Sequence, residues 1–424
     1  MRTETIELSG HLLDNLVLPK VLDLIIAFGG DYRIEEIRVG YSPRDASTAR
    51  VRVEAPDART LNEILEQVTR SGATMAGRPE VQMRPAPKAG VFPDDFYATT
   101  NLRTEIYHRG RWMRVANAEM DCGIVLDRAR GTARCLRMHR IRKGDQVVVG
   151  HAGIRVEPID RQADRQAFEF MGSAVSSEKP KLLLIRRIAE KIRETQRAGR
   201  KVLLVGGPAI VHTGAGPHLE ALLNAGCVDV LFAGNALAAH DIEASMFGTS
   251  LGVSLTSGKP VEHGHEHHLR AINRVRRAGS IAAAVRAKLI KGGVMHACVR
   301  RRVPFVLVGS IRDDGPLPDV ITEMHEAQDA MRAKLPGVGL CIMIGTMLTS
   351  IAVGNMLPAD VFTVCVDINP AVVTKLADRG TFQALGLVTD AEMFLRQLAR
   401  ELGLKDVPAP KTKPARSKRA GSRS

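Results

Sequence analysis

Short apolar runs that alternate with helical segments restrict the fold of this chain more than any other feature. Each run fits a buried strand, and glycine, asparagine, threonine or aspartate stands at or just before its end. The five runs cover residues 201–207, 228–235, 303–310, 339–346 and 362–370. Alternation of this kind predicts an α/β fold with a doubly wound parallel sheet. In such sheets, groups that handle ligands lie outside the carboxyl ends of the strands.

The rest of the chain predicts three further regions. Residues 1–87 show the order β-α-β-β-α and predict a small α+β, ferredoxin-like domain. Residues 88–171 are dominated by strand patterns and predict a β-rich domain, followed by the α/β domain over 172–404. Residues 405–424 have the composition of a disordered basic tail.

A large share of the net charge of +14 lies in the last 20 residues of the chain. The tail has seven Lys/Arg and one Asp, so it contributes +6, and about +8 remains for the other 404 residues. Aromatic residues make up only 4% of the chain, which argues against stacking platforms for single-stranded nucleic acid. We expect no specific nucleic-acid partner, although the tail would attract polyanions without specificity.

Cysteine, histidine and apolar patterns bear on the compartment and on metal binding. None of the six cysteines forms a CxxC pair, which predicts reduced core thiols in a cytoplasmic protein. No signal peptide or membrane-spanning run is expected. The histidine-rich run 263–268 has no Cys or carboxylate partner at a defined spacing. We therefore expect no metal, and interpret that run as a helix cap or as part of a substrate crevice.

Carboxylates follow two of the apolar runs. Asp313 and Asp314 stand beside Arg312 before a Gly-Pro turn, and they fit a ribose or nicotinamide clamp, an acid/base pair or a simple turn. Asp367 closes the last apolar run. An acid at that place accepts both ribose hydroxyls in NAD sites, although it also fits a helix cap before Pro370.

Two other features are candidates for proton chemistry or substrate binding. His212 and His240 each follow a strand end, and imidazole is suited to proton transfer near neutral pH. The segment 115–123 places Asn117, Glu119, Asp121 and Cys122 beside a predicted turn. It fits either a polar loop with one buried thiol or a loop that faces the substrate.

Four long motifs resemble a known family. The motifs GNALAAHDIEASMFGTSLG, GSIRDDGPLPD, GTMLTSIAVGNMLP and VDINPAVVTKLADRG are similar to the archaeal NAD-dependent ornithine cyclodeaminases and to the carboxyl-terminal half of the cyanobacterial arginine dihydrolase/ornithine cyclodeaminases. Residues 1–90 resemble the conserved region of lysine-oxoglutarate reductase/saccharopine dehydrogenase. The resemblance spans roughly residues 5–403, and the guanidine-hydrolysing domain of the bifunctional enzymes has no counterpart here.

The resemblance implies a lyase of arginine and ornithine metabolism that forms L-proline and ammonia from L-ornithine with a recycled NAD. It places the cofactor contacts at eight positions: Asn235, Ala236, Asp314, Thr346, Met347, Leu348, Thr349 and Asp367. Thr349 stands where the family pattern has histidine. Asp121, Asp313 and His240 are candidate catalytic residues, with Asn117, Glu119 and Cys122 as candidate substrate contacts. A homodimer or homotetramer is expected.

Two alternative functions are compatible with the same residues. An NAD-dependent dehydrogenase of a related basic amino acid would accumulate NADH. A non-catalytic NAD-binding regulator of amino-acid metabolism would bind the cofactor without turning over ornithine or related diamines.

Overall fold

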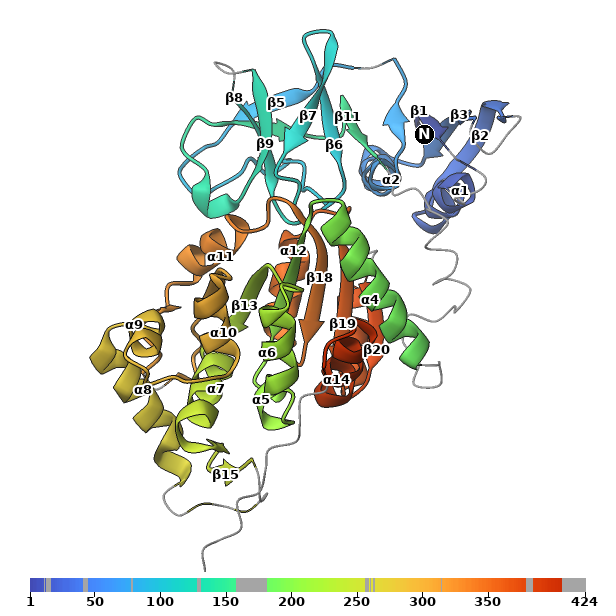
Figure 1. Cartoon of the computed structure of the whole chain (residues 1–424). Helices are drawn as coiled ribbons and strands as arrows, with labels where there is room; N and C mark the ends of the chain where they lie inside the picture. The colour runs from blue at the N-terminus through green and yellow to red at the C-terminus, as the bar shows by residue number, and fades with distance from the viewer. Residues whose placement is uncertain are drawn as a thin grey trace, which may run out of the picture. The chain divides into compact units, whose positions relative to one another are not determined.

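Figure 1 shows the chain as a computed structural model with two compact units. The first unit contains residues 1–172 and 355–360, and the second contains 173–354 and 361–424. Within them, the structure describes residues 1–10, 12, 17–40, 45–77, 79–127, 131–157, 181–255, 259, 261, 264–313, 315–378 and 384–405. The predicted tail over 406–424 therefore lies outside the described residues.

The first unit begins with an antiparallel sheet in the order β2-β3-β1-β4, which is a ferredoxin-like arrangement. Its elements are β1 (Arg2–Gly10), α1 (Val17–Ala27), β2 (Asp31–Arg38), β3 (Ser47–Ala55), α2 (Ala58–Arg70) and β4 (Thr74–Met75). Residues of β3 are alternately buried and exposed, so one face of the sheet packs on α1 and α2. The side chain of Asp57 caps α2 by accepting a hydrogen bond from the Thr60 N–H.

A second sheet in the same unit has the order β11-β6-β7-β9-β8-β10-β5. Its strands are β5 (Gln82–Pro85), β6 (Thr104–His108), β7 (Arg111–Ala116), β8 (Gly123–Asp127), β9 (Thr132–Leu136), β10 (Gln146–Val149) and β11 (Ile154–Val156), with a 3₁₀ turn, η1 (Met138–Arg140). Residues 355–360 join this unit: the Met120 N–H donates to the Asn355 carbonyl, and the Ala359 N–H to the Asn101 carbonyl.

The second unit is built on a parallel sheet in the order β17-β16-β13-β12-β18-β19-β20. Its strands are β12 (Lys201–Gly206), β13 (Val230–Gly234), β16 (Phe305–Val308), β17 (Val320–Ile321), β18 (Val338–Ile344), β19 (Phe362–Asp367) and β20 (Ala384–Val388). All seven residues of β18 are buried, as expected of a strand covered on both faces. A short hairpin, β14 (Thr249–Ser250) and β15 (Val253–Ser254), stands apart.

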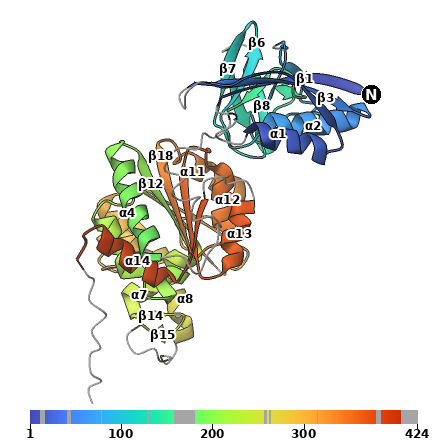
Figure 2. The same cartoon turned by 90° about the vertical axis from the view of Figure 1, so that its right-hand side faces the viewer.

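Helices cover both faces of this sheet. Figure 2 shows α4 and α14 on one side of it and α12 and α13 on the other. The described helices of this unit are α4 (Lys181–Arg197), α5 (Ala209–His212), α6 (Gly216–Asn224), α7 (Asn235–Phe247), η2 (Gly264–Glu266), α8 (His267–Ala278), α9 (Ile281–Arg286), α10 (Val294–Arg301), α11 (Met324–Arg332), α12 (Leu348–Met356), α13 (Pro370–Asp378) and α14 (Ala391–Glu401).

The predicted fold class is confirmed, with differences in detail. The five predicted strands are β12, β13, β16, β18 and β19, and the structure adds β17 and β20 at the two edges. The ferredoxin-like and β-rich regions belong to one compact unit. The chain passes from the first sheet to the second between β4 and β5, before residue 87. The domain boundaries at 87, 171 and 404 otherwise stay a prediction. Among the described residues, no helix is long and apolar enough to span a membrane.

Two glycine turns touch where the strand order reverses. β12 and β18 are adjacent in the sheet. The strands that follow β12 in sequence are added on one side of this pair, beginning with β13, and those that follow β18 on the other, beginning with β19. The Gly207 N–H donates to the Ile344 carbonyl over 2.9 Å, and a β-carbon on Gly207 would overlap the carbonyl oxygen of Gly345. Gly345 itself has a φ of 61°, which favours glycine. The two turns can approach this closely only because neither has a side chain.

We therefore predict that Gly207→Ala lowers the free energy of unfolding by about 1–3 kcal/mol, because the added methyl overpacks the contact with Gly345. Urea unfolding measures the difference. Gly216→Ala is the matched control: its β-carbon would meet no atom within 4 Å, so this change should be neutral or slightly stabilising. Equal stability of Gly207→Ala and wild type would contradict the close contact.

Candidate active site

The carboxyl edge of the parallel sheet in the second unit brings most of the predicted residues together. β12 ends at Gly206, β13 ends at Gly234 and β18 ends just before Gly345. Helices α5, α7 and α12 begin within a few residues of these ends, so their first N–H groups face the same edge. Backbone donors at helix starts beside a glycine turn suit the phosphates of a dinucleotide.

Large apolar side chains are exposed at this edge. Ile311 follows β16, Met347 and Leu348 follow β18, and Ile368 follows β19; all four have at least 42% of their surface exposed, and Leu348 has 77%. Met347, Leu348 and Ile368 follow two adjacent strands, β18 and β19, and Ile311 follows β16 farther along the same sheet, so these four are more than scattered surface residues. They fit the sides of a ligand with flat, apolar faces, such as the rings of a dinucleotide.

Asn235 ties two strand ends together. It is the first residue of α7 and only 6% exposed. Its Nδ2 donates to Asp313 Oδ1 over 3.0 Å, and its Oδ1 accepts from the Leu317 N–H over 3.1 Å. The other oxygen of Asp313 accepts from the Ser310 N–H over 2.7 Å. Both carboxylate oxygens of Asp313 thus bind donors of the protein, which fits a residue that shapes the segment after β16.

Asp367 ends β19 at the same edge, and its side chain is partly exposed. Its Oδ1 accepts from the Asn369 N–H over 2.9 Å, which forms a tight turn before α13. This contact occupies one carboxylate oxygen. A turn and a ribose contact are therefore compatible roles for Asp367, since a carboxylate has about four acceptor positions.

A buried glutamate organises the histidines near this edge. Glu243 lies on α7 and is fully buried, and its Oε2 lies 2.9 Å from Nδ1 of His240. Its Oε1 accepts from the Thr249 hydroxyl over 2.9 Å and from the Gly252 N–H over 3.2 Å. Burial alone would raise the pKa of Glu243, but these hydrogen bonds outweigh it and leave that pKa below its usual value. An ionised Glu243 accepts a hydrogen bond from the Nδ1–H of His240, which leaves Nε2 of His240 as the basic nitrogen.

The histidine chain continues from the interior to the surface. His212 is exposed at the end of α5, its ring centroid lies 4.8 Å from that of His240, and its Nδ1 lies 2.7 Å from the Ser250 hydroxyl. Partial burial of the ring and the neighbouring His240 lower the pKa of His212, so its ring is neutral at physiological pH. On the other side, Thr249 also contacts Nδ1 of His267 over 2.8 Å. We call His212, His240, His267, His268 and Glu243 the histidine cluster.

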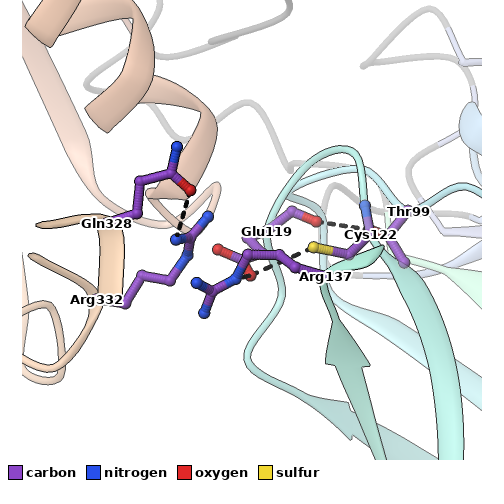
Figure 3. A network of polar contacts seen from close by, with 6 residues as sticks. All are labelled: Thr99, Glu119, Cys122, Arg137, Gln328 and Arg332. Carbon is purple, nitrogen blue, oxygen red and sulfur yellow. Dashed lines mark hydrogen bonds and ion pairs between the residues drawn. The ribbon is translucent and has the colours of Figure 1, made fainter. Parts of the chain in front are cut away.

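The loop 117–122 lies in the first unit, and its polar groups are largely engaged there (Figure 3). Asn117 and Asp121 are exposed and adopt left-handed backbone conformations, with φ of 59° and 61°. Glu119 and Cys122 are buried: Glu119 Oε1 accepts from Arg137 over 3.1 Å and from the Cys122 thiol over 3.3 Å. The Thr99 hydroxyl donates to the Glu119 carbonyl over 2.7 Å. Glu119 and Cys122 thus help to hold the loop in its shape.

The structure brings most of the predicted site residues to the carboxyl edge of the parallel sheet, but not all of them. At the carboxyl edge lie Asn235, Ala236, Asp313, Thr346, Met347, Leu348, Thr349 and Asp367, with His240 one and a half turns into α7. Asp314 lies outside the described residues. The roles of all these residues, and of those in the loop 117–122, stay predictions. Glu243 was missed, although its spacing of three from His240 on one helix is a signal for a side-chain pair.

The histidine-rich run 263–268 is only partly described. His267 and His268 belong to the histidine cluster, while His263 and the His265 side chain lie outside the described residues. Among the residues with described positions, no group of three or more His, Cys, Asp or Glu side chains could hold a metal ion.

Comparison with known families matches nearly the whole chain. Residues 186–398 match the Rossmann-fold region at the carboxyl terminus of ArgZ-like arginine dihydrolases, and residues 103–185 match the first carboxyl-terminal region of the same proteins. Residues 3–102 match the conserved region of the LOR/SDH bifunctional enzyme.

Individual relatives agree with these matches. An ornithine cyclodeaminase of Methanothermobacter thermautotrophicus is 52% identical over 95% of this chain and 98% of its own length. The apo crystal structure of ArgZ, a cyanobacterial arginine dihydrolase, has a TM-score of 0.83 and 38% identity over 95% of this chain and 58% of that one. The ternary complex of AgrE with ornithine and NAD⁺ has a TM-score of 0.52 and 41% identity, over 95% of this chain and 57% of that one.

Proposed function

This chain belongs to the ornithine cyclodeaminase family that includes the archaeal enzymes, and we propose that it converts L-ornithine to L-proline and ammonia with a tightly bound, recycled NAD. The family inferred from the four motifs is thereby confirmed. The observation that supports the cofactor best is the carboxyl edge itself, where a glycine contact, three helix starts and exposed apolar side chains meet. AgrE, a relative over 95% of this chain, binds ornithine and NAD⁺ together.

The residues at this edge fit a dinucleotide. The start of α12, just after the turn at Gly345, offers backbone N–H groups for the pyrophosphate. Asp367 offers a carboxylate to the ribose hydroxyls, and Met347, Leu348 and Ile368 offer apolar surface to the rings. When bound, NAD supplies a hydride acceptor for the α-carbon of the substrate and returns the hydride within the same turnover.

The chain's own contribution to the chemistry is to move protons. The reaction requires a neutral amine for ring closure and a proton for the departing ammonia, so it calls for a group that titrates near neutral pH. His240 is the best supported of the three candidates, because a buried, ionised Glu243 fixes its ring and leaves Nε2 basic. Asp313 is bound by Asn235 and Ser310, and we assign it to positioning.

His212 extends this arrangement toward solvent. Its neutral ring lies beside His240 and is exposed at the end of α5. This arrangement places a second imidazole between His240 and solvent. We therefore propose that the histidine cluster carries the protons of the cyclisation, with Glu243 as a positioning residue. The exposed Asn117 and Asp121 stay candidates for substrate binding or catalysis, with Glu119 and Cys122 as candidate contacts in the same loop.

The arginine dihydrolase activity of the longer relatives is not part of the proposal. The chain spans 58% of the bifunctional AgrE and ArgZ enzymes, so we do not extend arginine dihydrolase activity to it.

All six cysteines are free and buried, which supports a reducing, cytoplasmic compartment. A homo-oligomer is part of the proposal.

The first prediction concerns the reaction. Purified protein incubated with NAD and L-ornithine should release proline and ammonia in equal amounts without net formation of NADH, because the hydride returns to the product. Proline and ammonia are assayed together with absorbance at 340 nm. Steady accumulation of NADH would indicate the dehydrogenase instead. NAD binding without release of proline or ammonia would indicate a non-catalytic regulator.

A second prediction isolates the charge of Asp367. Asp367→Asn keeps an oxygen for the Asn369 N–H, so the turn should persist, but it loses the negative charge that favours the ribose hydroxyls. We expect NAD affinity to fall about tenfold or more, the order of one charge-assisted hydrogen bond, with an unchanged melting temperature. Calorimetric titration with NAD measures this. The control, Asp390→Asn, changes the cap of α14 after the next strand and should leave affinity intact.

A third prediction concerns the histidine cluster. Glu243→Gln can still accept from Thr249 and Gly252, but its amide would donate to Nδ1 of His240 and so move the ring proton to Nε2. We expect kcat to fall on the order of 10²-fold or more, with an altered pH profile and with NAD affinity retained. Glu266→Gln, a change in the partly exposed ion pair with Arg270, should be silent. An unaltered kcat for Glu243→Gln would remove His240 from the mechanism.

A further inference from the structure

The outer strand of the ferredoxin-like sheet has an open edge. β2 pairs with β3 on one side, and no other described strand pairs with it. All eight of its residues are exposed, from Asp31 to Arg38. Figure 1 shows β2 at the border of its sheet, beside α1. A strand edge of this length that carries apolar residues is a template for pairing with another strand.

Apolar side chains line this edge. Tyr32, Ile34 and Ile37 lie opposite Val53, Val51 and Ala49 of β3, so they point to the face on which α1 and α2 pack. They are nevertheless 38–44% exposed, because the sheet stops at β2. Three further exposed apolar residues stand at or after the end of α1 and directly after β2: Ile26, Phe28 and Val39. We call these six residues the edge patch.

A bulge gives β2 an unusual symmetry. The register with β3 skips Glu35, so Ile34 lies opposite Val51 and Glu36 lies opposite Arg50. As a result Asp31, Arg33, Glu36 and Arg38 share the outer face, although Asp31 and Arg38 are seven residues apart. Without the extra residue, the two ends of the strand would point to opposite faces. The bulge stands at the middle of the strand.

The charges of β2 complement one another when the strand is paired with itself. In an antiparallel pair centred between Ile34 and Glu35, Asp31 lies opposite Arg38 of the second copy, and Arg33 lies opposite Glu36. Tyr32 then lies opposite Ile37 on the inner face, so every one of these pairs joins residues of the same face. The two-fold axis repeats each pair, which gives four pairs of opposite charge.

Other registers are worse. A slip by one residue places inner-face residues opposite outer-face residues. A slip by two places Arg33 opposite Arg38 in one direction and Asp31 opposite Glu36 in the other, and like charges in direct opposition are destabilising. The sequence of β2 thus specifies one register with a copy of itself.

We propose that β2 pairs with β2 of a second copy of this chain, in antiparallel register about Ile34 and Glu35, and joins two four-stranded sheets into one of eight strands. The partner sheet extends over the edge patch and covers Tyr32, Ile34 and Ile37. The backbone N–H and C=O groups of the open edge obtain partners at the same time. This two-fold contact joins the first unit of one copy to the first unit of the other. The histidine cluster and the carboxyl edge belong to the second unit and take no part in it.

Sedimentation of the full-length protein tests the contact. Ile34→Lys puts a charge on the inner face of the edge and should halve the assembly mass at micromolar concentration, from tetramer to dimer or from dimer to monomer. Met138→Lys is the matched control: Met138 is 50% exposed on η1 of the same unit, and its change should leave the mass unaltered. A monomeric wild type, or an Ile34→Lys variant of unaltered mass, would overturn the proposal.

A charge exchange tests the register and guards against a variant that only unfolds. Asp31→Arg puts an arginine opposite Arg38 of the other copy, and the two-fold axis repeats this repulsion. The dissociation constant for the two copies should rise on the order of tenfold. Adding Arg38→Asp restores opposite charges, and the double variant should recover most of that affinity. Circular dichroism shows that each variant is folded. A double variant that associates no better than Asp31→Arg alone would contradict this register.

Discussion

The contact between two glycine turns sets the geometry on which the candidate site depends. Gly207 and Gly345 follow adjacent parallel strands, and their backbones touch because neither has a β-carbon. At this point the chain order of the sheet reverses, so α5 and α12 leave the same edge in different directions. Open α/β sheets bind dinucleotides where the strand order reverses in this way. The exposed Met347 and Leu348 stand directly after this contact.

Carboxylates in the second unit differ in role because they differ in environment. Asp241 is fully buried and accepts from the N–H groups of Val294 and Met295 at the start of α10; burial raises its pKa to about 7. Glu243 is just as buried but binds His240, Thr249 and Gly252, and its pKa falls. The first stabilises a helix start, whereas the second holds a charge beside an imidazole. Proximity to the site alone would not separate them.

The sequence predicted the second unit better than the chemistry within it. Long apolar strands such as β18 are buried on both faces and have a local signal, whereas β17 has two residues and acquires its identity by pairing with β16. Asn235 and Asp313 were both singled out, but their hydrogen bond joins residues 78 positions apart and has no local signature. Glu243 was missed because its role depends on the hairpin β14–β15, which brings Thr249 and Gly252 to it.

The central claim is that one site removes a hydride from ornithine and returns it to the same carbon. L-Ornithine with deuterium on its α-carbon tests this directly, with the released proline examined by mass spectrometry. We expect proline to retain the deuterium on its α-carbon while ammonia is released and no reduced cofactor accumulates. Proline without the label, or deuterium found in free reduced cofactor, would contradict a closed hydride cycle.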